Sequence, residues 1–242
     1  MVFKDRADAG RQLAEALLPY ERENCLIFAL PRGGVEVAIE VARRLRKPMD
    51  VLVVRKIGAP GHEELAAGAV GPEDVLILNR DVLVMLGLQP NALQSRIDQA
   101  RTELNRRLRQ YRGNRPFPGL NGKTAIIVDD GLATGATARA ALKALKALGP
   151  AKIVLAVPVG TRPLLSQLRY EVDDLVCLEK PDSFDAVSAW YERFPQCTDA
   201  QVTQWLKESE QLNRQNKWQE AQTQNSPSSQ SPKPMHWENL PL

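Results

Sequence analysis

The fold of this chain is decided by the stretch Thr124-Ala125-Ile126-Ile127-Val128-Asp129-Asp130-Gly131-Leu132-Ala133-Thr134-Gly135-Ala136-Thr137. Its first five residues are apolar or β-branched, a pattern typical of a buried strand. Two acids and a loop of small residues follow, and we expect a helix to begin near Ala138. Free backbone N–H groups at a helix N-terminus suit a phosphate. Because the acids suit vicinal hydroxyls or a cation, the stretch predicts a site for a phosphorylated sugar.

A second strand–turn–helix pattern lies upstream of this stretch. An apolar run at 25–30 leads into Pro31-Arg32-Gly33-Gly34 and an apolar helical pattern at 35–45. A further apolar run at 49–54 ends in Arg55-Lys56. This spacing predicts a βαβ unit with two parallel strands. The paired glycines would let the backbone approach an anion closely, and the Arg32 guanidinium offers a planar charged fork.

The region between the two patterns predicts a loop, a hairpin and two helices. Residues 57–64 read as a mobile loop because they contain two glycines and a proline, and 65–78 predict a hairpin around Gly71-Pro72. A short helix at 81–86 and a long one at 90–112 follow. The long helix carries six arginines outside its apolar stripe: Arg96, Arg101, Arg106, Arg107, Arg109 and Arg112. We favour a solvated basic face, with a nucleic-acid surface as the alternative.

The remaining pattern predicts a single α/β domain over residues 1–212. A first helix is expected at 5–18, strands at 152–157 and 175–178, and helices at 138–148, 163–170 and 199–212. The helical insertion covers about 81–113. From residue 213 to 242 the composition turns to Gln, Asn, Ser and Pro, so we expect a disordered tail.

The overall composition is that of a soluble protein. Of 242 residues, 43% are hydrophobic and 25% charged, and the net charge of +3 is too small to argue for nucleic acid. No apolar run approaches the roughly 18 residues of a membrane span, and residues 1–6 lack a signal-peptide core. The three cysteines are widely spaced without a C-x-x-C pair. We therefore expect a cytoplasmic protein with reduced cysteines and no membrane association.

The acidic pair followed by x-x-x-T-G-x-T resembles the ribose-phosphate signature of the type I phosphoribosyltransferase family. The resemblance covers roughly residues 3–199 and is greatest to predicted bacterial phosphoribosyltransferases of unestablished substrate. It implies the α/β fold of that family: a central, mostly parallel sheet flanked by helices. A mobile hairpin loop, an inserted helical pair and a small hood would complete it.

The resemblance also implies roles for individual residues. Asp129 and Asp130 would contact the ribose hydroxyls, act in catalysis and hold Mg²⁺ indirectly, through substrate or water. The other phosphoribose-binding residues would be Ala133, Thr134, Gly135, Ala136 and Thr137. The pyrophosphate-binding residues would be Arg32, Gly33, Gly34, Arg55 and Lys56.

The acceptor side departs from one branch of the family. Enzymes acting on hypoxanthine or guanine carry an Asp where this chain has Ala133. Adenine enzymes share the A-T-G pattern and use a Glu of the mobile loop, so Glu63 or Glu64 is the candidate catalytic base here. An aromatic group (Phe184, Trp190 and Tyr191) could supply a stacking face for the acceptor or could equally belong to the core.

The function that the resemblance implies is a Mg²⁺-dependent glycosyltransferase, more closely a pentosyltransferase, of nucleotide metabolism. It would move phosphoribose from 5-phospho-α-D-ribose 1-diphosphate to an unidentified nitrogen nucleophile such as a nucleobase, releasing pyrophosphate, and would form a homodimer. Two alternatives remain open at this point. One is a regulatory protein of the same fold that senses nucleotides or binds RNA, and the other is a phosphoribosyl hydrolase.

Overall fold

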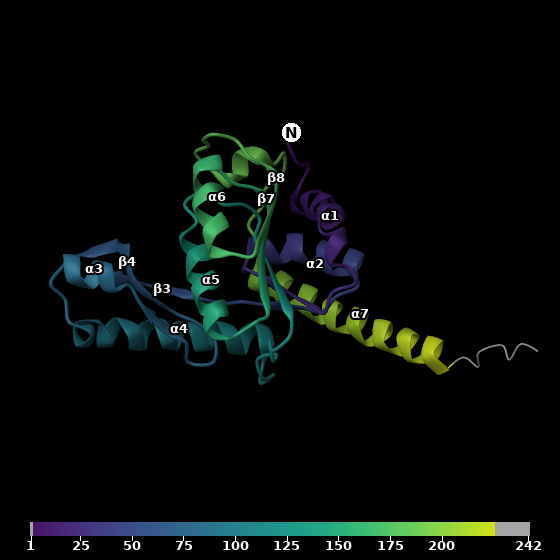
Figure 1. Ribbon diagram of the computed structural model, residues 1–242, viewed down its shortest axis with the longest axis horizontal. Coiled ribbons are helices and arrows are strands. Elements are labelled where there is room, and N and C mark those ends of the chain that lie inside the picture. Colours follow the sequence, from purple (N-terminus) through teal and green to yellow (C-terminus); the bar gives the residue numbers. More distant parts are fainter. Residues whose placement is uncertain (1, 226–242) are drawn as a thin grey trace, which may run out of the picture.

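The computed structural model describes residues 2–225 and contains a five-stranded parallel sheet in the order β2-β1-β6-β7-β8 (Figure 1). Its strands are β1 (Cys25–Ala29), β2 (Met49–Val51), β6 (Thr124–Val128), β7 (Lys152–Val159) and β8 (Asp174–Glu179). All four strand pairs are parallel, which confirms the predicted βαβ arrangement. The strands read as continuous apolar runs because both faces of the sheet are covered.

Helices cover the two faces of this sheet (Figure 1). The helices α1 (Arg6–Ala16), α2 (Gly33–Leu45) and α7 (Asp199–Asn225) pack against one face, where Ile27 and Ile126 point. The helices α5 (Ala136–Ala147) and α6 (Arg162–Leu168) pack against the other, where Phe28 and Ile127 point. Alternation along each strand therefore divides the apolar core into two layers.

An arm extends away from the sheet (Figure 1). It contains an antiparallel sheet of β3 (Arg55–Ala59), β4 (His62–Val70) and β5 (Leu76–Leu78), followed by α3 (Arg80–Met85). A 3₁₀ turn (Pro90–Leu93) then leads into α4 (Gln94–Arg112). The hairpin at 65–78 and the two inserted helices are thus confirmed.

Two expectations about the start of the arm were wrong. Residues 57–64 were expected as a loop, but they form the end of β3, a turn and the start of β4. Arg55-Lys56 begin β3 in this second sheet and do not end β2. The physical reason is that Gly61 adopts a positive φ of 74°, which allows a tight turn, while Ile57 and Ala59 are buried on one side of the strand.

The last helix is longer than expected. The predicted disorder from residue 213 was wrong for residues 213–225, because α7 continues to Asn225. The first turns of α7 are packed against the core through the buried Val202 and Leu206, and they serve as the nucleus of the helix. Residues of good helix propensity then extend the helix beyond these turns. The amide of Asn216 also donates to the carbonyl of Arg46 at 3.4 Å. The rest of the predicted tail, 226–242, lies outside the described residues.

None of the helices within residues 2–225 combines the length and the apolar character that crossing a membrane would need.

Candidate functional site

The acidic pair and the glycine pair meet at one edge of the sheet. Asp129 and Asp130 follow β6, and Gly33-Gly34 begin α2 after a three-residue connection from the neighbouring strand β1. A Cβ atom on Gly33 would lie 1.9 Å from Asp130 Oδ2, and one on Gly34 would lie 2.9 Å from Asp129 Cα. Only glycine permits this approach, so the two motifs predicted from the sequence form one contiguous surface.

Among the described residues, Arg6 is the close cationic partner of the acidic pair. Arg6 Nε donates to Asp130 Oδ2 at 2.7 Å, and the Asp130 backbone N–H donates to Asp129 Oδ1 at 2.9 Å. Burial, followed by the negative charge of Asp130, raises the pKa of Asp129 well above its usual range. A ligand that brings hydroxyl donors or a cation to this pair would relieve that repulsion.

The loop that follows the acids presents an open cradle. The Ala133, Thr134, Ala136 and Thr137 side chains are exposed. Gly135 has a positive φ of 71° and is followed by α5, which begins at Ala136, two residues earlier than expected. The first N–H groups of that helix lack partners within it, so they can bind an anion.

The arm meets this cradle across a pocket of about 230 Å³ between α5 and the β3–β5 sheet. Lys56 of β3 and Thr134 of the loop both line it. Ala136 lines the pocket as well, so the structure brings together one residue predicted for pyrophosphate and two predicted for the phosphoribose. Of the two arginines predicted to bind pyrophosphate, Arg32 is exposed and Arg55 is half-buried.

The predicted base Glu63 is bound by the arm itself. Its carboxylate Oε2 accepts a hydrogen bond from Arg96 Nη1 of α4 at 2.6 Å. This bond lowers the pKa of Glu63. The alternative base, Glu64, lies in β4, and its side chain is outside the described part of the structure.

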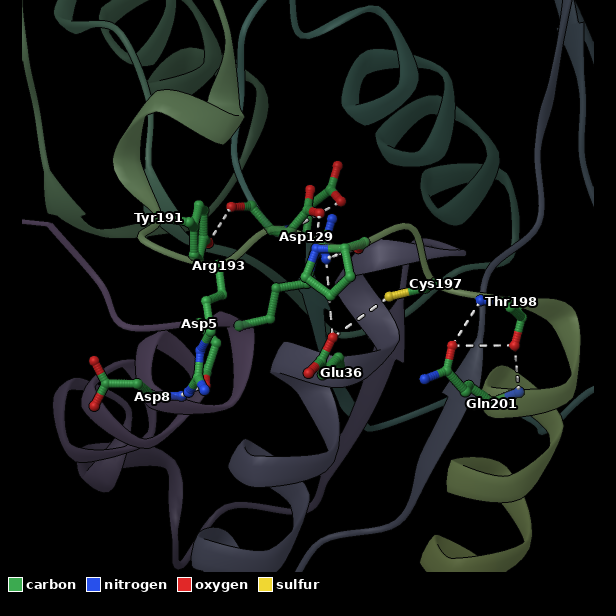
Figure 2. Close-up of polar contacts among 12 residues, drawn as sticks. Asp5, Asp8, Glu36, Asp129, Tyr191, Arg193, Cys197, Thr198 and Gln201 are labelled. Atoms are coloured by element: carbon green, nitrogen blue, oxygen red, sulfur yellow. Dashed lines mark hydrogen bonds and ion pairs between the residues drawn. The ribbon is translucent and has the colours of Figure 1, made fainter.

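The aromatic group predicted for the acceptor divides into core and partly open residues. Tyr191 is buried, and its hydroxyl donates to the Asp130 carbonyl at 2.5 Å (Figure 2). The Phe3 and Phe194 rings pack against the Tyr191 ring at centroid distances of 5.5 and 4.9 Å. Phe184 and Trp190 are half-buried. Tyr191 thus supports Asp130 from the core, and a stacking face would have to come from the other two.

The sequence did not indicate the residues that hold the acidic pair in place. Arg6 is buried and contacts Asp130, and its Nη1 lies 3.9 Å from Glu36 Oε2. Glu36 in turn accepts a hydrogen bond from the Cys197 thiol at 3.4 Å (Figure 2). These residues come from α1, α2 and the segment before α7, so no local pattern links them. The one available signal was an arginine in the first turn of α1, a position that the helix dipole disfavours.

Four of the six arginines of α4 form ion pairs. Arg96 pairs with Glu63, Arg106 and Arg107 with Glu103, and Arg112 with Asp50. Arg112 is only 7% exposed, so it does not belong to the expected solvated face. The ion pairs of the other three arginines support a solvated face over a nucleic-acid surface, and that choice stays a prediction.

Within the described residues, no group of three or more His, Cys, Asp and Glu side chains is placed to hold a metal ion by itself. The two carboxylates of Asp129 and Asp130 fit the indirect role expected of them, because oxygen ligands suit Mg²⁺ and this ion usually keeps several waters.

Comparison with known proteins gives consistent matches. Residues 3–191 match the model of the phosphoribosyl transferase domain. Curated proteins from two Mycobacterium tuberculosis strains, CDC 1551 and H37Rv, carry the name "Putative phosphoribosyl transferase" and are 44% identical over 205 residues, or 85% of this chain. The matched region is 46% of each relative, so the chain spans about half their length. The crystal structure of TT1426 from Thermus thermophilus is 42% identical with a TM-score of 0.78, covering 86% of this chain and 99% of that one.

Proposed function

The chain belongs to the phosphoribosyl transferase family, and on that premise we propose that it moves phosphoribose from 5-phospho-α-D-ribose 1-diphosphate to a nitrogen nucleophile. Pyrophosphate leaves in the reaction. Because the group transferred is a pentose, the protein would be a pentosyltransferase. The acceptor we expect is a nucleobase, which would place the reaction in nucleotide metabolism.

The observation that carries this proposal is the contact between the two glycines and the two acids. The donor carries its diphosphate on C1 of the ribose and its hydroxyls on the next two ring carbons, so it needs a diphosphate site directly beside a hydroxyl site. Gly33 and Gly34 approach Asp130 and Asp129 so closely that no side chain fits between them. The T-G-A-T cradle, which begins four residues after Asp130, supplies the third site for the 5-phosphate.

The chemistry follows from this arrangement. Departure of pyrophosphate builds positive charge on the ribose ring, as in the oxocarbenium-like transition state of glycoside hydrolysis. The Asp129 and Asp130 carboxylates at the sugar would stabilise that charge electrostatically, and Arg32 would stabilise the departing diphosphate. Asp129 and Asp130 would hold Mg²⁺ through the sugar hydroxyls or water, and the ion would supply neutralisation of the pyrophosphate charge.

Acceptor activation is assigned to the arm. With Ala133 in the loop, no acid of the cradle can take the acceptor's proton. Glu63 is the described carboxylate of the β3–β4 hairpin that could do so, after its bond to Arg96 opens. Phe184 and Trp190 are the half-buried rings on which a base could stack.

Product analysis tests the proposal. The protein would be incubated with the diphosphate donor, Mg²⁺ and a panel of nucleobases, with Asp130→Asn as the control, and the products separated by anion-exchange chromatography. We expect a new nucleotide and pyrophosphate in equal amounts with one of the bases. Free ribose 5-phosphate without a nucleotide would indicate the hydrolase instead, and donor binding without turnover would indicate a nucleotide-sensing protein. We also expect a homodimer, which sedimentation equilibrium would check.

A further inference from the structure

We infer that Arg6 is a positioning residue of the proposed active site, which fixes the Asp130 carboxylate against Gly33 in the orientation that binds the sugar hydroxyls. This inference rests on the proposed function. Arg6 lies in the first turn of α1 and is only 5% exposed, yet its partner Asp130 is 124 residues away in sequence.

The Arg6 guanidinium is held on several sides. Nε donates to Asp130 Oδ2 and Nη1 to the Pro195 carbonyl, each at 2.7 Å. Its central carbon lies 3.6 Å from the centroid of the Phe194 ring. An arginine fixed in this way has little freedom, so it holds the carboxylate in one place.

The bond from Arg6 involves only one oxygen of Asp130. Arg6 Nη1 donates to the Pro195 carbonyl, and none of the described Arg6 hydrogen bonds reaches Asp130 Oδ1, so that oxygen can face a ligand. The backbone of Asp130 is fixed independently, through the hydroxyl of Tyr191 on its carbonyl. A Cβ atom on Gly33 would lie 2.9 Å from Arg6 Nε, so the arginine, the glycine loop and the acid meet at one point.

A second buried arginine provides a matched comparison. Arg112 is 7% exposed, donates to a carboxylate (Asp50) and to a proline carbonyl (Pro116), and lies 5.0 Å from the ring of Phe117. Here, however, Nε contacts both carboxylate oxygens, at 3.0 and 3.1 Å. Asp50 lies in β2, away from the acidic pair. Arg112 therefore joins the end of α4 to the sheet, whereas the same construction at Arg6 supports an acid of the site.

The test compares Arg6→Met, Arg6→Lys and Arg112→Met by isothermal titration, at a temperature where circular dichroism shows each variant folded. The probes are 5-phospho-α-D-ribose 1-diphosphate with Mg²⁺, and inorganic phosphate. Loss of a charge-assisted hydrogen bond predicts that Arg6→Met binds the diphosphate about tenfold or more weakly. Arg6→Lys should recover part of that affinity. Phosphate should bind every variant as it binds the wild type, because phosphate makes no use of Asp130.

Arg112→Met should melt at a lower temperature and bind the diphosphate like the wild type. Unchanged diphosphate affinity in Arg6→Met would overturn the inference, and so would an equal loss in Arg112→Met. If Arg6→Met does not fold, Arg6→Lys and Tyr191→Phe take its place, because each weakens one of the contacts that hold Asp130. Both should bind the diphosphate less tightly than the wild type. Wild-type affinity in both variants would overturn the inference. Failure of the wild type to bind the diphosphate would refute the proposed function itself, and that result is seen before any variant is compared.

Discussion

The Glu63 carboxylate lies 2.6 Å from a guanidinium nitrogen of Arg96, so the β3–β4 hairpin is bound to the long helix of the arm. Both side chains reach the surface, with Glu63 65% exposed. An exposed pair of this kind is weak and can open without a large change in the fold. The hairpin thus has a defined resting position from which Glu63 could be released.

This pairing predicts a pH effect if Glu63 is the acceptor base. Arg96 lowers the pKa of Glu63, so replacing Arg96 by Met should raise that pKa toward its ordinary value. The carboxylate would then stay protonated up to a higher pH, so the acid limb of the pH–rate profile should shift to higher pH in Arg96→Met. An unmoved acid limb, together with normal turnover in Glu63→Gln, would exclude Glu63 as the base.

Removing the charge of Asp130 should abolish most of the activity without unfolding the protein. Asn can still accept the bond from Arg6, so we expect Asp130→Asn to retain the wild-type circular dichroism spectrum. Its kcat should fall by about 10²–10³-fold, the usual effect of losing a group that stabilises transition-state charge. A variant as active as the wild type would contradict the role given to this acid.

Gly33 should not tolerate even a methyl group. In Gly33→Ala the new carbon would lie within van der Waals distance of Asp130 Oδ2, which Arg6 holds in place. We expect weaker binding of the diphosphate donor and a lower melting temperature. Gly119→Ala is the matched control, since a Cβ atom there would meet nothing within 4 Å and the φ of Gly119 is not positive. Equal behaviour of the two variants would show that the contact is unimportant.

Thr134 should contribute a hydroxyl to the 5-phosphate. Its side chain is exposed, so Thr134→Val should leave the melting temperature unchanged. Losing one hydrogen bond to a charged group predicts an affinity for ribose 5-phosphate about tenfold lower. Thr134→Ser, which keeps the hydroxyl, should bind normally, and an equal loss in both variants would argue for a packing role instead.

The bond between Tyr111 and Asp199 joins α4 to α7 and should make stability sensitive to alkaline pH. Burial, together with this bond, raises the pKa of Tyr111 from 10.0 to about 12. A raised pKa means that the folded state retains the proton, so the stabilisation is complete below pH 10 and is lost as the pH rises to 12. The difference in unfolding free energy between wild type and Tyr111→Phe should therefore shrink over that range; a constant difference would contradict the assignment.

The sequence was sufficient for features that depend on local pattern. The buried strands were predictable because a strand covered on both faces is continuously apolar, as in Ala125–Val128. The acidic pair, the glycine pair and the T-G-A-T loop could be assigned from residue type and order. That they meet follows from parallel strands, whose carboxyl ends share one edge of the sheet.

What could not be predicted depends on contacts between distant segments. The sequence around Arg6 does not indicate Asp130 as its partner, because the contact forms only when α1 packs against α2 and against β7 and β8 of the sheet. The arm's β3 was missed because glycine and proline signalled a loop, whereas Gly61 forms a tight turn between two paired strands. Likewise, the low hydrophobicity of residues 213–225 suggested disorder, although a helix can continue from a packed turn without burying much surface.

The measurement that tests the central claim most directly is isothermal titration of the wild-type protein with 5-phospho-α-D-ribose 1-diphosphate, with and without Mg²⁺, beside the same titration of Asp130→Asn. The account predicts one binding site per chain that is tighter with Mg²⁺ and is strongly weakened in Asp130→Asn. Absence of binding by the wild type at millimolar ligand, or equal binding by both proteins, would contradict it.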